Sequence, residues 1–289
     1  MSGKKKVIAY AIYVVFLTVL FLVILFPEDT VRPFIVRNIQ RVDPDISMEI
    51  GSLRPSLMPP GITMQDVTVY YQNQSMVESD NTRFSPAVFA FFRGIPAFGF
   101  KVEMFDGTVS GKCRMTSNTP SVESVVNAKI SGINLAAIEE LKDLLDYPLT
   151  GRVKGSFSGT LKGPAYTFAS EFDIEKASAT LAGRIPGIDS LRFESITGAL
   201  TGDERKVTVE RLAANGPQVD AELTGDIRLR RPYEASVLNL KGFIKPHSGF
   251  ISELRKVLPV DLFLRKDPGE KGFPVRINGT IGEPGFSMK

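Results

Sequence analysis

Tryptophan is absent from this 289-residue sequence, and cysteine and histidine occur once each, as Cys113 and His247. A single cysteine excludes an internal disulfide, and one cysteine with one histidine cannot supply the ligands of a zinc site built from these residues. The sequence also lacks a Gly-x-Ser-x-Gly elbow, a phosphate-binding loop and a zinc-binding His-Glu motif. We therefore expect the protein to use no cofactor and not to be an enzyme.

An excess of charge of one sign is missing as well. The sequence has 35 lysine and arginine residues and 32 acidic residues, which gives a net charge of +3. The basic residues are scattered along the chain between the acidic ones. A nucleic-acid partner is not expected, because such a surface needs a dense basic region. Hydrophobic residues make up 43% and charged residues 23%, which is the ordinary range of a folded protein with a real core.

A long hydrophobic run occurs near the N-terminus. Residues 7–26 carry no charge and follow three consecutive lysines; as a helix they would be about 30 Å long, enough to cross a hydrocarbon core. No small residues precede Pro27, so we expect the anchor to be retained. The arginines that follow residues 7–26 balance the three lysines that precede them, so the count of basic residues does not decide the orientation. Glu28 and Asp29, which closely follow the hydrophobic run, favour a cytoplasmic N-terminus. We expect a cytoplasmic tail at 1–6, a transmembrane helix at 7–26 and one folded domain at 27–289.

Residues 151–163 alternate with a period of two, which is typical of a β-strand with one apolar face. In this segment, GRVKGSFSGTLKG, small or apolar residues take the odd positions and polar residues take the even ones. The four glycines all fall on the apolar face, where they leave shallow slots and indicate curvature or the close approach of another group. This stretch predicts a curved sheet with one apolar side.

The same alternation returns along most of the chain. It predicts a mainly β fold: a long curved antiparallel sheet, forming a groove or half-barrel, with a few short helices and one preceding transmembrane helix. The pattern suits a packed sandwich, whose apolar side is closed by other side chains, as well as an open groove that an acyl chain could occupy. The residues that we expect to line the groove are Val109, Val153, Phe157, Leu161, Leu223, Ile227 and Ile277.

Four stretches predict short helices beside the sheet: residues 28–42, 87–93, 134–146 and 249–258. Residues 28–42 place their apolar residues on one helical stripe, which is typical of a helix packed on protein or of one lying on lipid headgroups. Residues 87–93, AVFAFFR, are apolar nearly all round and predict either a buried helix or a hydrophobic knob for a partner or membrane. The residues of this knob are Val88, Phe89, Phe91 and Phe92.

Several segments resemble a known group of proteins. The strands LTGRVKGSFSGTLKGP, ANGPQVDAELTGDIRL and INGTIGEPGF are similar to those of AsmA-like proteins, which combine an inner-membrane anchor with a long β-structured periplasmic part. The length, the single anchor and the sequence FSPAVFAFFRG followed by VEMFDGTVSG most resemble the protein N family of type II secretion systems (GspN). The likeness carries over no catalytic residues.

The resemblance implies a protein of the Gram-negative envelope, anchored once in the inner membrane with the bulk of the chain in the periplasm. The first function that it implies is that of a component of a type II secretion system, which acts by binding and assembly. Its partners would be the inner membrane and other secretion-system or envelope proteins. The alternative is an AsmA-like carrier of lipid or another hydrophobic ligand between the envelope membranes. Because the chain is much shorter than the large lipid-transport proteins of this type, one copy is not expected to span the periplasm.

Overall fold

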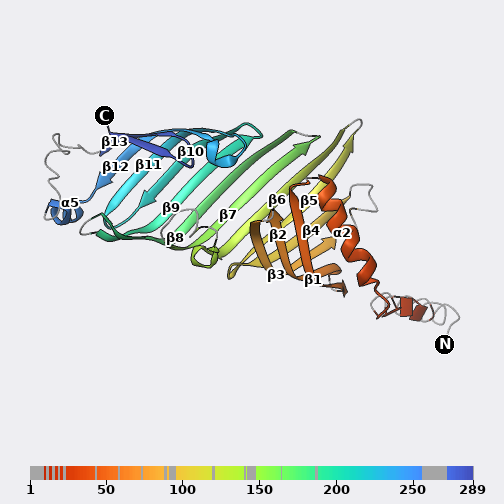
Figure 1. Ribbon diagram of the computed structural model, residues 1–289. Coiled ribbons are helices and arrows are strands. Elements are labelled where there is room, and N and C mark those ends of the chain that lie inside the picture. The colour runs from red at the N-terminus through yellow and green to blue at the C-terminus, as the bar shows by residue number, and fades with distance from the viewer. Residues whose placement is uncertain are drawn as a thin grey trace, which may run out of the picture.

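The computed structural model describes residues 10, 13–14, 17–18, 20–21, 24–42, 44–57, 59–72, 74–87, 90, 96–118, 121–139, 141, 148–163, 165–185, 188–255 and 272–288. These residues form one open sheet of fourteen antiparallel strands, each paired with the strand that precedes it in sequence (Figure 1). The expectation of a mainly β fold built on a long antiparallel sheet is therefore confirmed. The strands are β1 (Ile46–Leu57), β2 (Pro60–Tyr71), β3 (Gln74–Pro86), β4 (Ala97–Met104), β5 (Gly107–Asn118), β6 (Ser121–Asn134), β7 (Leu149–Lys162), β8 (Ala165–Ile185), β9 (Ile188–Asp203), β10 (Lys206–Asn215), β11 (Val219–Arg228), β12 (Val237–Pro246), β13 (Phe273–Gly279) and β14 (Pro284–Met288).

The sheet is a single layer, with β1 at one edge and β14 at the other (Figure 1). The chain exposes 19537 Å² of surface, whereas a globular monomer of this mass exposes about 12,000 Å². A second sheet does not pack on the first within the described residues, since all fourteen strands belong to one ladder. The packed-sandwich alternative therefore does not describe this part of the chain.

Helices are few and short in the described part of the chain. They are α2 (Glu28–Val42) and α5 (Ser248–Arg255), together with the single 3-10 turns η1 (Leu135–Ala137) and η2 (Tyr233–Ala235). No described helix is long and apolar enough to cross a membrane, and only scattered positions of residues 7–26 are described. The transmembrane helix stays a prediction.

Helix α2 packs on the sheet at β1 and β2. Acidic residues in its first turn and Arg41 in its last complement the helix dipole. Its apolar stripe, predicted from the sequence, covers the best-buried cluster of the described core, in which Leu53 is 1% and Met64 2% exposed. Of the two interpretations of residues 28–42, packing on protein is the one observed; Val31, Ile35 and Val36 lie against this cluster.

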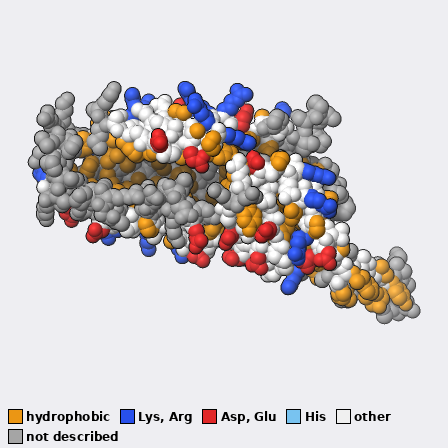
Figure 2. All heavy atoms as spheres, viewed as in Figure 1, with side chains coloured by type: hydrophobic (Ala, Val, Ile, Leu, Met, Phe, Trp, Pro, Cys, Tyr) orange, Lys and Arg blue, Asp and Glu red, His pale blue; other side chains and the backbone are white. Residues whose placement is uncertain are grey.

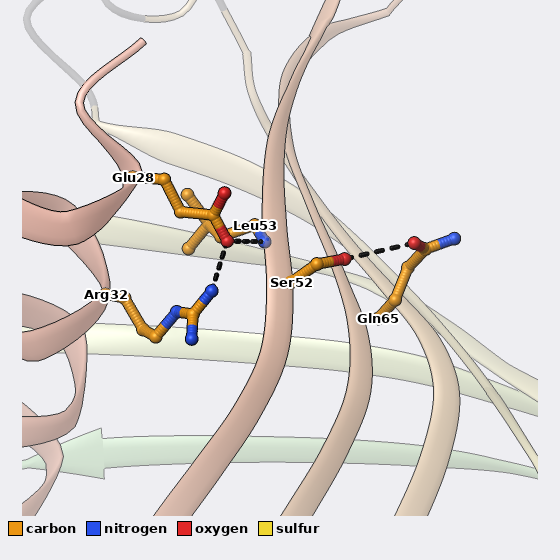
Figure 3. A network of polar contacts seen from close by, with 5 residues as sticks. All are labelled: Glu28, Arg32, Ser52, Leu53 and Gln65. Carbon is orange, nitrogen blue, oxygen red and sulfur yellow. Dashed lines mark hydrogen bonds and ion pairs between the residues drawn. The ribbon is translucent and has the colours of Figure 1, made fainter.

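The same helix also protects the edge of the sheet. The Glu28 carboxylate accepts a hydrogen bond of 2.8 Å from the Leu53 backbone N–H, which points away from β2, and a second one from Arg32 (Figure 3). An unpaired N–H on an edge strand can recruit another strand. Because Glu28 accepts the hydrogen bond from the Leu53 N–H, this donor of β1 is not available to another strand.

Replacing Glu28 with alanine should therefore loosen α2 from β1. The hydrogen bonds from Arg32 and from the Leu53 N–H hold the pKa of Glu28 below its ordinary value of 4.5. Because this pKa is lower in the folded chain, the carboxylate stabilises the fold above pH 4.5, and the stabilisation is lost as the pH falls through the folded pKa. At neutral pH we expect the Leu53 amide of the variant to exchange about five-fold faster. The advantage of wild type in thermal unfolding should shrink as the pH is lowered.

The matched control is Asp29→Ala, which removes an acid from the same helical turn but not the bond to β1. Exchange at Leu53 should be unchanged in this variant. Equal acceleration in both variants would mean that helix charge, and not the contact to β1, protects the edge.

Candidate functional site: an apolar face along the sheet

One face of the sheet is apolar from edge to edge. Residues that pair directly across neighbouring strands point to the same side, so the register traces rows of side chains across the sheet. One such row crosses all fourteen strands and contains a single polar residue, Thr82. It consists of Leu53, Met64, Thr82, Val102, Val109, Ile130, Gly155, Phe172, Gly198, Leu212, Leu223, Gly242, Val275 and Met288.

A second row runs beside the first and also crosses every strand. Its only polar member is Ser170, which lies between Phe157 and Leu200. With strands about 4.8 Å apart, each row follows the sheet for about 60 Å. The row consists of Pro55, Ile62, Phe84, Phe100, Gly111, Ala128, Phe157, Ser170, Leu200, Val209, Gly225, Leu240, Ile277 and Phe286.

All seven residues predicted to line a groove lie on this apolar face. Val109, Phe157, Leu223 and Ile277 belong to the rows above, and the other three share the face through their positions in β7 and β11. Six of the seven are half-buried, whereas Leu161, near the end of β7, is 47% exposed. Figure 2 shows hydrophobic side chains gathered in the hollow of the molecule over β7 to β12.

Three glycines of this face, Gly111, Gly198 and Gly202, lie against phenylalanine rings from neighbouring strands. A Cβ added at Gly198 would lie 2.2 Å from the Phe172 ring, and one at Gly111 would lie 2.6 Å from the Phe100 ring. For the glycines of residues 151–163 the sequence predicted shallow slots and the close approach of another group, and at Gly155 that group is the backbone and Cβ of Phe172. A ring that lies along the sheet over a strand glycine is a known way to compensate for the missing side chain. The rings therefore fill part of the space that these glycines leave on the apolar face.

These phenylalanines belong to the candidate site although the sequence did not single them out. Phe172 lies opposite both Gly155 and Gly198, and Phe168 lies opposite Gly159 and stacks on Phe157 at 5.9 Å between ring centroids. The usable signal is a phenylalanine on one strand paired with glycine on the next. It requires the register, which the sequence alone does not supply.

Helix α2 is the α-helix that packs on the apolar face in the described part of the chain. It covers the end of the face at β1 and β2. Apart from this contact, the main helix–strand contact in the described part of the chain is that of η1 with β7. The predicted knob residues Val88, Phe89, Phe91 and Phe92 lie outside the described residues, so their role stays a prediction.

The described residues contain no group of three or more His, Cys, Asp or Glu side chains that could hold a metal ion. Cys113 is 6% exposed, and burial raises the pKa of its thiol, which makes it unreactive. His247 Nε2 lies 2.8 Å from Asp220 Oδ2 and joins the start of α5 to β11, a structural contact.

Comparison with known proteins adds no family to this geometry. No protein-family model matches the sequence, and neither characterised proteins nor solved structures give a significant match. The resemblance to AsmA-like proteins and to GspN therefore stays a prediction.

Proposed function

We propose that the protein binds a hydrophobic chain, such as the acyl chain of a lipid, along the apolar face of its sheet. The observation that supports this most strongly is the pair of apolar rows, each of which crosses all fourteen strands with a single polar residue. Monomeric soluble proteins rarely leave a contiguous apolar surface of this extent exposed without a ligand or partner. In an envelope protein, the role would be that of a carrier between membranes.

The dimensions and energetics of the face suit an acyl chain. One leaflet of a bilayer provides about 15 Å of hydrocarbon, half of a core about 30 Å thick. The rows are several times longer than this, so the sheet has room for more than one chain. Each methylene removed from water contributes about 0.8 kcal/mol, and a face without buried charges imposes no compensating desolvation cost.

The test uses the full chain in nanodiscs that contain a phospholipid with a diazirine on its acyl chain. After illumination, mass spectrometry should find the label on apolar-face residues of β5 to β12, such as Phe157, Leu161 and Leu200. Polar-face neighbours on the same strands, such as Ser156 and Ser158, are the internal control. Label confined to residues 7–26, or divided equally between the two faces, would contradict the proposal.

A second candidate is an assembly role in a type II secretion system, as the resemblance implies. The edge at β14 supports it: Phe286 is 74% and Ile281 40% exposed, and no described strand pairs with the outer side of β14. A free edge can accept a strand from another envelope protein. Co-purification with secretion components would support this role, and unchanged export after deletion of the gene would rule it out.

A further inference from the structure

The polar face of the sheet is strongly basic over β3 to β6. Five cationic side chains line a single hollow of about 990 Å³, which we call the basic hollow. The described residues that line it include no aspartate or glutamate. The five cations are Arg83, Lys101, Lys112, Arg114 and Lys129.

The register sets these charges side by side. Arg83 pairs directly with Lys101, and Lys112 and Arg114 are alternate residues of β5, so they share a face. Like charges opposite each other on neighbouring strands repel and destabilise a sheet. Among the described residues, the basic hollow forms one ion pair, between Lys101 Nζ and Glu103 Oε1 at 2.5 Å. Arg83 also interacts electrostatically with Glu103, so the charges of Lys112, Arg114 and Lys129 are the ones left for an external anion to neutralise.

We propose that the basic hollow docks on the anionic headgroups of a lipid bilayer. The cations suit an extended anionic surface better than one small anion, because Lys112, Arg114 and Lys129 are exposed and do not converge on a buried point. Small and apolar residues, among them Pro59, Ala87 and Ala90, line the same hollow and present no competing negative charge.

The position of the hollow along the chain supports a membrane in particular. The predicted anchor ends at Phe26, α2 begins at Glu28, and α2 packs directly on β1. Strand β3 is two strands from β1, about 10 Å along the sheet. The basic hollow therefore lies near the point where the predicted anchor joins α2, on the other face of the sheet, and each cation near an anionic surface adds to its attraction.

The experiment measures how fast individual lysines are acetylated in the full chain, held in nanodiscs and followed by mass spectrometry. Discs contain phosphatidylcholine alone or with about one third phosphatidylglycerol. We expect Lys112 and Lys129 to react about five-fold more slowly in the anionic discs. Lys241 on β12 is the internal control and should react equally in both. Salt at about 0.5 M should remove the difference, because it screens charges beyond a few ångströms.

The matched variants separate docking from a general charge effect. Arg83→Glu with Arg114→Glu should restore fast labelling of Lys112 and Lys129 in anionic discs. Arg211→Glu with Arg276→Glu makes the same change of charge on the polar face of β10 and β13. This pair should leave the protection of Lys112 and Lys129 in anionic discs intact. Equal labelling in the two kinds of disc would overturn the proposal. The proposal would also be overturned if inorganic phosphate, added to phosphatidylcholine discs, slowed the acetylation of Lys112 and Lys129 as much as the anionic discs do. That result would mean that the hollow binds a free anion.

Discussion

Replacing Ser170 with aspartate is expected to lower photo-labelling of the apolar face by at least about ten-fold while the sheet remains folded. Ser170 lies near the middle of the second row, directly paired with Phe157 on one side and Leu200 on the other. Its side chain is small and half-buried, so the change removes little packing. A carboxylate there would have to lose its hydration against an acyl chain, and the cost of an unpaired charge in apolar surroundings exceeds the roughly 1.4 kcal/mol that a ten-fold change requires.

The control for this variant is Ser158→Asp. Ser158 is on β7 and pairs with Ala169, next to Ser170 in β8, but it points to the polar face and is exposed. It introduces the same charge one strand away on the opposite side. Circular dichroism should be the same for both variants, and only Ser170→Asp should lose the label. A fully labelled Ser170→Asp protein would mean that the chain does not lie along this row.

The strand alternation could be predicted from the sequence because it is a local property. In β7 the burial of side chains follows the predicted period of two from Leu149 to Ser158 without interruption. The prediction fails where a strand changes face. In β1, Ile50 and Leu53 both point into the core although they are three residues apart, because Asp66 on the partner strand takes a positive φ of 52° opposite Gly51. Such an irregularity depends on the partner strand, and the sequence of one strand does not reveal it.

The candidate site could be predicted residue by residue but not as a surface. Each of the seven predicted groove residues lies on the apolar side of its own alternating strand. What joins them is the register of thirteen strand pairs, and this depends on turn lengths and on bulges such as that at Gly132, where Ile130 and Ile133 pair in turn with Gly155 and Val153. The cap of Glu28 on Leu53 was also beyond prediction, since it joins residues 25 positions apart through a backbone donor.

Gly242→Ala should have the largest effect on stability, and that effect should be confined to one end of the sheet. Gly242 pairs with Leu223, and a Cβ there would lie 1.7 Å from the Glu222 carbonyl oxygen and 2.9 Å from Leu223 Cα. These are backbone atoms, so no side chain can move aside, and β11 and β12 must separate. Overpacking of this kind costs about 3 kcal/mol, which corresponds to about 100-fold faster amide exchange in the affected strands.

The confinement follows from the single-layer architecture. Every strand pairs only with its neighbours in sequence, so a disturbance at the β11–β12 pair reaches β1 to β6 only through all the intervening strands, as in a repeat protein. Hydrogen exchange should accelerate in β11 to β14 and stay at its wild-type rate in β2 to β6. The control is Gly249→Ala in α5, where an added Cβ meets nothing within 4 Å and alanine favours the helix. Uniform acceleration of exchange across all fourteen strands would instead mean that the sheet unfolds as one cooperative unit, and that pairing between neighbouring strands is not its main source of stability.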